Sequence, residues 1–140
     1  MKIIQGITSY LTVVFIKDQV EFLRNNGYEV KVVCNRDFES PYEGLAVKHI
    51  PFEREISPFR DLKALFRLGR YLNREKPDII HFSTPKAGLL GMIAGFLCRT
   101  KTRIYMIRGL RLETATGNKK HILLATEKIA CAFSTHVMVI

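Results

Sequence analysis

The sequence predicts an α/β fold of the Rossmann-like, doubly wound type, a mostly parallel sheet with helices on its faces. Three observations support it. Short apolar runs rich in β-branched residues alternate with longer segments of helical periodicity, which is typical of β-α-β units. The 140 residues suit one domain. A chain that is 47% hydrophobic is neither disordered nor a small disulfide scaffold.

The apolar runs predict six strands, at Lys2–Gly6, Glu29–Asn35, Ala46–Pro51, Ile79–Ser83, Arg103–Arg108 and His136–Ile140. The segments between them predict four helices, at Val13–Asn26, Pro58–Glu75, Lys86–Arg99 and Lys119–Ser134. Gly27 is expected to end the first helix in a left-handed conformation. Ser57 is expected to cap the second helix, with Pro58 in its first turn.

The last predicted strand, His136–Ile140, is expected to be buried, and the chain stops at its carboxyl edge. Doubly wound sheets bind their ligands at that edge. We therefore expect residues 1–140 to form a single N-terminal domain whose continuation lies outside this chain. The three cysteines, Cys34, Cys98 and Cys131, lack metal-ligand spacing and are expected to be buried thiols of a reducing compartment.

The charge is basic and unevenly distributed. The net charge is +9, and residues 84–120 hold eight basic residues against Glu113 alone. In the second predicted helix, basic residues recur every three or four positions on one face, at Arg60, Lys63, Arg67, Arg70 and Arg74. The apolar residues expected to pack on the sheet are Leu62, Leu65, Phe66, Gly69 and Leu72. The basic face is either attracted to an anionic membrane surface or an ordinary solvated face.

Two segments at the carboxyl ends of predicted strands are candidate binding sites. Thr84 and Lys86 open a helix, where free N–H groups and a cation favour an anionic or hydroxylated ligand. The loop after the fifth strand holds groups suited to phosphate or sugar, namely Arg108, Gly109, Arg111 and Glu113. The alternatives are a plain helix cap and a surface Arg–Glu pair. His81, near the end of the fourth strand, is either a polar core residue or part of the site.

The sequence lacks the motifs that are typical of several enzyme classes. No G-x-G-x-x-G follows the first strand, and neither a P-loop nor a G-x-S-x-G elbow is present. The histidines lack metal-ligand spacing, so no metal site is expected.

Five stretches of the chain carry a resemblance to a known family, at residues 15–30, 54–62, 77–81, 84–91 and 108–114. They resemble the N-terminal domain of family 4 glycosyltransferases of the GT-B fold, which build capsular, O-antigen and exopolysaccharide chains. The resemblance implies a retaining transfer from a nucleotide-sugar to an acceptor hydroxyl, without a metal or cofactor. This domain would bind the acceptor, a glycan or a polyprenyl-linked glycan, and the missing C-terminal domain would bind the donor. This fragment alone is therefore expected to be inactive.

The resemblance also implies roles for several of the candidate residues. It implies that Gly6, Thr8 and Ser9 form a loop near the donor diphosphate, although the family's usual paired glycines are absent there. Arg108 stands where many members have a histidine, and a guanidinium stays protonated, so it would bind sugar or phosphate and not act as a base. A lipid-linked acceptor implies a cytoplasmic protein at the inner face of the cytoplasmic membrane, which suits the basic face.

Two other functions fit the composition. A nucleic-acid-binding module would explain the charge, but no basic strand carries the exposed aromatic residues that stack on bases, so no specific nucleic acid is expected. A regulatory α/β domain that has lost activity is the other alternative.

Overall fold

The computed structural model describes residues 1–36, 47–108 and 114–140. Its centre is a six-stranded parallel sheet in the order β3-β2-β1-β4-β5-β6. The strands are β1 (Lys2–Ser9), β2 (Glu29–Asn35), β3 (Val47–His49), β4 (Ile79–Ser83), β5 (Thr102–Ile107) and β6 (His136–Val139). The order reverses between β1 and β4, the topological switch point of a doubly wound sheet. The predicted fold class is confirmed.

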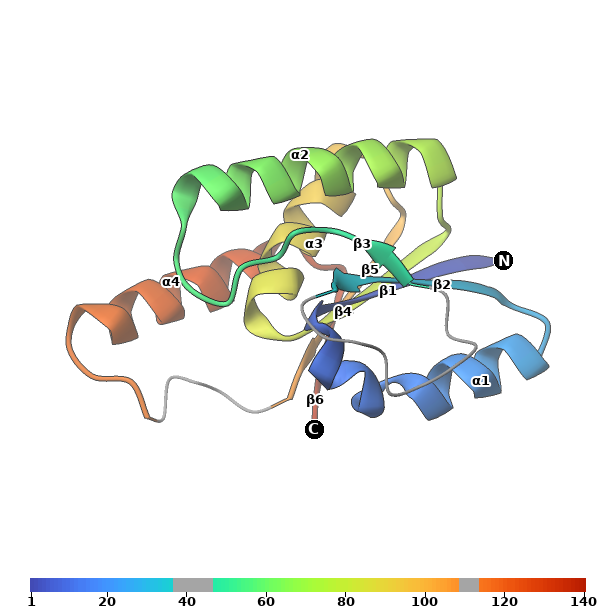
Figure 1. Cartoon of the computed structure of the whole chain (residues 1–140), viewed down its shortest axis with the longest axis horizontal. Helices are drawn as coiled ribbons and strands as arrows, with labels where there is room; N and C mark the ends of the chain where they lie inside the picture. The colour runs from blue at the N-terminus through green and yellow to red at the C-terminus, as the bar shows by residue number, and fades with distance from the viewer. Residues whose placement is uncertain (37–46, 109–113) are drawn as a thin grey trace.

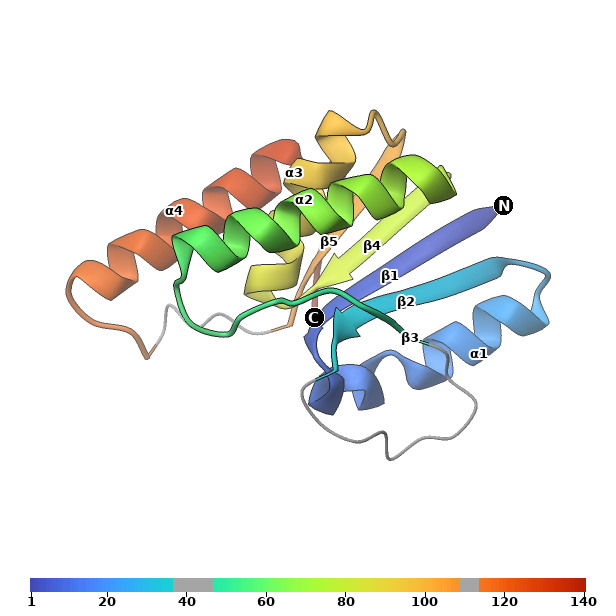
Figure 2. The ribbon, with the colours of Figure 1, turned by 45° about the horizontal axis from the view of Figure 1, so that its top comes forward.

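The helices cover both faces of the sheet (Figures 1 and 2). They are the 3-10 helix η1 (Tyr10–Phe15), α1 (Lys17–Asn25), α2 (Pro58–Glu75), α3 (Pro85–Leu97) and α4 (Asn118–Phe133). On one face lies α1, and on the other lie α2, α3 and α4 (Figure 2). Right-handed crossovers explain this division, because the chain moves from β1 toward β3 in its first half and from β3 toward β6 afterwards.

Four expectations about the elements need correction. Ser57 stands at the start of α2, but its side chain makes no cap hydrogen bond. The predicted loop at Gly6 to Ser9 is wrong, because β1 continues to Ser9. The first predicted helix is shorter, because η1 occupies its first residues and α1 begins at Lys17. The strand at His136 is confirmed as parallel, but all four residues of β6 are exposed at the edge of the sheet.

Small residues bring α3 close to the sheet. Added Cβ atoms at Gly91 and Gly88 would collide with the rings of Phe82 and Tyr105, respectively. Both rings are buried in the larger core cluster, between the sheet and the helices α2 to α4. The amino end of α3 is thereby fixed beside the ends of β1 and β4.

The orientation of α2 differs from the sequence prediction. Its buried residues are Ala64, Leu68, Tyr71 and Leu72. Leu62 and Phe66, which were expected on the sheet, are 65% and 70% exposed. The inward side follows the apolar stripe of these four buried residues, and two carboxylates lie on the same side of the helix. Near its start, Asp61 pairs with Lys86 at 2.6 Å, and at its end Glu75 pairs with Lys31 at 2.7 Å.

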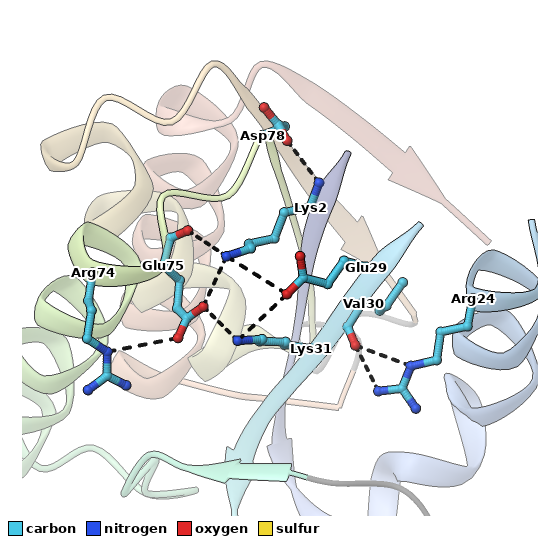
Figure 3. A network of polar contacts seen from close by, with 8 residues as sticks. All are labelled: Lys2, Arg24, Glu29, Val30, Lys31, Arg74, Glu75 and Asp78. Atoms are coloured by element: carbon cyan, nitrogen blue, oxygen red, sulfur yellow. Dashed lines mark hydrogen bonds and ion pairs between the residues drawn. The ribbon is translucent and has the colours of Figure 1, made fainter. Parts of the chain in front are cut away.

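Glu75 is the centre of a charge cluster at the amino ends of β1 and β2 (Figure 3). Its Oε2 lies 3.2 Å from Lys2 Nζ and 2.7 Å from Lys31 Nζ. Lys2 Nζ also donates to the Glu75 carbonyl at 3.0 Å. The hydrogen bond from Lys31 holds the pKa of Glu75 below its usual value. The cluster therefore ties the end of α2 to the neighbouring strands β1 and β2.

Replacing Glu75 by Gln is expected to lower the free energy of unfolding by about 1 kcal/mol at pH 7, because a partly buried charged hydrogen bond is lost. The folded-state pKa is lowered. The stabilisation is therefore present above the unfolded pKa, about 4.3, and disappears as the pH falls through the folded value. Urea unfolding at pH 7 and pH 3 measures the difference. Glu21→Gln, at an exposed position on α1, is the control, and an equal loss at both pH values would contradict the prediction.

Candidate functional site

A cavity of about 450 Å³ opens at the carboxyl ends of β1, β4 and β5. This is the position where doubly wound sheets bind ligands, because the loops after β1 and β4 diverge at the switch point. Its polar lining comes from hydroxyl, carboxylate and cationic side chains, namely Thr8, Ser9, Thr12, Arg54, Asp61, Thr84, Lys86, Tyr105, Arg108 and Thr126.

Two threonines join the strands at the base of the cavity. The hydroxyls of Thr8 and Thr84 lie 2.7 Å apart, and the Thr8 N–H donates to Thr84 Oγ1 at 3.1 Å. Thr8 Oγ1 also accepts from the Ala87 N–H at 3.2 Å. Thr8 therefore caps α3 from the neighbouring strand, and the predicted side-chain cap by Thr84 is wrong. Thr84 instead adopts a φ of 76°, a strained conformation for a residue other than glycine.

Lys86 is engaged within the protein. Its Nζ lies 2.6 Å from Asp61 Oδ2 and 3.0 Å from the Glu55 carbonyl. The side chains of both charged partners are mostly buried, at 14% and 20% exposed. This ion pair offsets the charge that was expected to bind an anion, and it fixes the start of α2 against α3.

Two arginines supply the positive charge at the cavity. Arg54 Nη2 donates to Ser9 Oγ at 3.1 Å from the segment between β3 and α2. Arg108 follows β5, and its guanidinium lies 5.9 Å from the centre of the Phe15 ring. Among the described residues, Arg108 Nε is buried without a hydrogen-bond partner. Burial also lowers the pKa of Arg108. An arginine held this way is suited to an anionic or sugar ligand.

The remaining wall of the cavity is apolar. It is formed by Phe15, Ile56, Pro85, Leu89, Met106, Ile107, Ile122 and Leu123. At its floor, the hydroxyl of Tyr105 donates to Glu127 Oε2 of α4 at 2.8 Å. Burial raises the pKa of both groups. The cavity thus combines cations and hydroxyls with an extended apolar surface.

His81 lies away from this cavity, on the α1 side of β4. It lines a second cavity of about 250 Å³ together with Gln5, Gln19 and apolar residues. Gln5 Nε2 lies 3.4 Å from His81 Nδ1, and His81 Nε2 has no partner among the described residues. Burial, with a smaller effect of the Arg108 charge, lowers the pKa of His81 to about 4. The imidazole is therefore neutral at pH 7.

The buried imidazole predicts a pH-dependent stability. The unfolded chain binds the proton near pH 6.5 and the folded chain only near pH 4, so stability falls as the pH drops between these values. At pH 5 this costs about 2 kcal/mol. His81→Gln is expected to remove that loss, as measured by urea unfolding at pH 7 and pH 5. His121→Gln, at an exposed position on α4, should behave like the wild type. An unchanged pH dependence in His81→Gln would exclude this assignment.

The structure places the other predicted site residues in different parts of the domain. Thr8, Ser9, Thr84, Lys86 and Arg108 are brought together around the large cavity. Gly6 is not, because it faces the ring of Phe82 in the core. Gly109, Arg111 and Glu113 lie outside the described residues. All five basic residues of the predicted stripe on α2 are exposed, as expected.

Sequence reasoning did not assign Arg54, Asp61 or Phe15 to the site. A signal for Arg54 was available, since it follows a predicted strand, and every loop after a strand of a parallel sheet lies at the carboxyl edge. No comparable signal exists for Phe15. It depends on η1 turning the chain back over the end of β1.

The fold and the cavity define a Rossmann-like α/β domain with a cavity at its switch point. The chain belongs to the glycosyl transferase 4-like family, whose model matches residues 8–140. It is 39% identical over 140 residues to the capsular polysaccharide biosynthesis glycosyltransferase CapM of Staphylococcus aureus, covering 99% of this chain and 37% of that protein. It is 29% identical over 100 residues to the UDP-Gal:alpha-D-GlcNAc-diphosphoundecaprenol alpha-1,3-galactosyltransferase of Escherichia coli, covering 69% of this chain and 26% of that protein.

Solved structures of low sequence identity share the fold. The lipopolysaccharide outer core galactosyltransferase WaaB aligns with a TM-score of 0.71 at 14% identity, over 98% of this chain and 38% of its own. MnaA of S. aureus, solved with UDP, aligns with a TM-score of 0.73 at 15% identity, over 98% of this chain and 37% of its own. The chain thus spans less than two fifths of the length of these proteins. Within the described ranges, none of the helices has both the length and the apolarity to cross a bilayer.

Proposed function

We propose that this domain is the acceptor-binding half of a retaining glycosyltransferase of polysaccharide biosynthesis, which transfers a sugar from a nucleotide-sugar to a lipid-linked glycan. The observation that carries the proposal is the cavity at the switch point, with Arg54 and Arg108 beside threonine hydroxyls and an apolar wall. Membership of the glycosyl transferase 4-like family and the glycosyltransferase activities of the two relatives named above support the proposal.

The chemistry assigns a role to each part of the cavity. Sugar transfer builds negative charge on the departing diphosphate, so fixed cations stabilise the transition state. Arg108 stabilises this charge or binds the sugar through hydrogen bonds, since its guanidinium does not act as a base. Gly109, Arg111 and Glu113 continue the same loop, and we propose that they bind sugar or phosphate. The donor itself is bound by a C-terminal domain beyond this chain, so residues 1–140 alone are inactive.

The mixed lining of the cavity favours a lipid-linked acceptor over a free sugar. A free sugar has a mostly polar surface with small C–H faces, so it gains less than a hydrocarbon chain from apolar walls such as Ile56, Leu89 and Ile122. A glycan on a polyprenyl diphosphate presents anionic oxygens beside hydrocarbon, which matches Arg54 and the apolar wall. We further propose that the protein is cytoplasmic and lies at the inner face of the membrane, with its basic residues on α2 toward anionic lipid.

The test is sugar transfer by the complete gene product. Labelled nucleotide-sugars are offered with an undecaprenyl-diphosphate-linked saccharide and, separately, with the same saccharide without lipid. Transfer to the lipid-linked acceptor with retention of anomeric configuration is expected. Absence of transfer from a full panel of nucleotide-sugars, together with salt-dependent binding to duplex DNA, would instead support the nucleic-acid alternative.

A further inference from the structure

The outer face of α2 carries large apolar side chains that the core does not use. Phe59, Leu62 and Phe66 are 89%, 65% and 70% exposed. Their spacing of three and four residues places them on one side of the helix. The inward side of α2 is complete without them, since Ala64, Leu68, Tyr71 and Leu72 are buried there. Among the described residues, no contact accounts for two exposed phenylalanines and a leucine on one side of a helix.

The apolar row borders a band of positive charge. On a helix with 100° per residue, Arg60, Lys63, Arg67, Arg70 and Arg74 occupy the sector directly beside it, and all five are exposed. Only Arg60 and Arg74 among them form ion pairs in the described part of the chain, with Glu53 and Glu75. An apolar row beside uncompensated cations is complementary to one surface above all, hydrocarbon bordered by anionic headgroups.

We propose that this face of α2 docks on an anionic lipid bilayer, with Phe59, Leu62 and Phe66 inserted at the interface and the basic band on the headgroups. The cations attract the protein to the surface, and the three apolar side chains hold it there in one orientation. The inference deepens the membrane contact of the proposed function, but its central claim rests on α2 alone.

The docking face leads directly into the cavity. Ile56 is 54% exposed, lines the cavity, and lies three residues before Phe59, just ahead of the start of α2. Along the chain, Ile56 therefore connects the membrane-facing residues with the apolar wall that includes Leu89. A lipid-linked acceptor would reach the cavity with its chain still in contact with the bilayer. This second step does rest on the proposed function.

Co-sedimentation of the complete gene product with vesicles, of phosphatidylcholine alone or mixed with phosphatidylglycerol, tests the docking. Phe59→Ser with Phe66→Ser is expected to weaken binding to the mixed vesicles at least 10-fold at every salt concentration. Lys63→Gln with Arg67→Gln and Arg70→Gln is expected to remove the preference for the anionic lipid and to flatten the salt dependence. Phe22→Ser, on α1 at the opposite face and 66% exposed, is the matched control and should bind like the wild type.

Wild-type binding by the double serine variant would overturn the insertion. Two further results, each pointing to a different occupant of this face of α2, would also overturn the membrane docking. A lower thermal midpoint would mean that the row packs on another segment of the protein, and a change in oligomeric state would mean that it packs on a second copy. Sugar transfer separates this inference from the proposed function. If vesicle binding depends on the phenylalanines but no nucleotide-sugar is used, only the proposed function fails.

Discussion

Arg108→Ala in the complete gene product is expected to lower kcat/KM for sugar transfer about 100- to 1000-fold. This is the usual effect of removing one charged hydrogen-bond donor from a site where negative charge develops. Arg108 stands at the carboxyl end of β5, lines the cavity and is partly buried. Because its surroundings exclude part of the solvent, each hydrogen bond that it donates is stronger than the same bond in water.

The arginine should be only partly replaceable. Lysine keeps the charge but loses the planar fork that donates two parallel bonds and stacks on Phe15, whose ring centre is 5.9 Å away. Arg108→Lys is therefore expected to recover no more than about a tenth of wild-type activity, one order of magnitude being the usual cost of a lost charged hydrogen bond. The pH profile should keep its shape in both variants, since a guanidinium that stays protonated adds no titration step.

Lys101→Ala is the matched control for Arg108, because Lys101 is an exposed cation just before the opposite end of β5. Its activity should equal that of the wild type. Urea unfolding should show that Arg108→Ala is as stable as the wild type to within about 1 kcal/mol, as for most partly exposed positions. Equal activity of Arg108→Ala and Lys101→Ala would remove Arg108 from the site.

The fold was predictable because its signal is repeated along the chain. Each strand is a short apolar run, and the sequence marks helix ends by residues of restricted or unusual backbone conformation, such as Pro58 at the start of α2 and Gly27 after α1. Burial depends on partners that are distant in sequence. The inward side of α2 is the stripe of Ala64, Leu68, Tyr71 and Leu72. It also carries Asp61, paired with Lys86, and Glu75, paired with Lys31, and such pairs cannot be identified from the periodicity of apolar residues.

The site was predictable in position more than in detail. The rule that ligands bind at the carboxyl edge of a parallel sheet placed Thr84, Lys86 and Arg108 correctly around one cavity. It did not predict which polar groups would form hydrogen bonds with one another inside the protein. Thr84 contacts Thr8 and Lys86 pairs with Asp61, so among the described residues of the cavity the cations left for a ligand are Arg54 and Arg108.

Gly91→Leu is expected to lower the free energy of unfolding by about 3 kcal/mol, at the upper end of what overpacking a core costs. Gly91 sits on the face of α3 that contacts β4, and an added Cβ would collide with the ring of Phe82. Phe82 is fully buried in the larger core cluster, and protein cores are close-packed, so its ring moves aside only at a cost. Accommodating a larger side chain therefore pushes α3 away from the sheet, together with Thr84 and Lys86 at its amino end.

Gly69→Leu in α2 is the matched control, since a Cβ there meets no atom within 4 Å. Leucine favours a helix over glycine, so this variant should gain roughly 0.5–1 kcal/mol. Urea unfolding followed by far-ultraviolet circular dichroism measures both, because the chain contains no tryptophan. Should Gly91→Leu be insoluble, Gly91→Ala provides the comparison, with an expected loss of about 1 kcal/mol. A gain at position 91 equal to that at position 69 would show that α3 does not lie as close to the sheet as the collision with Phe82 requires.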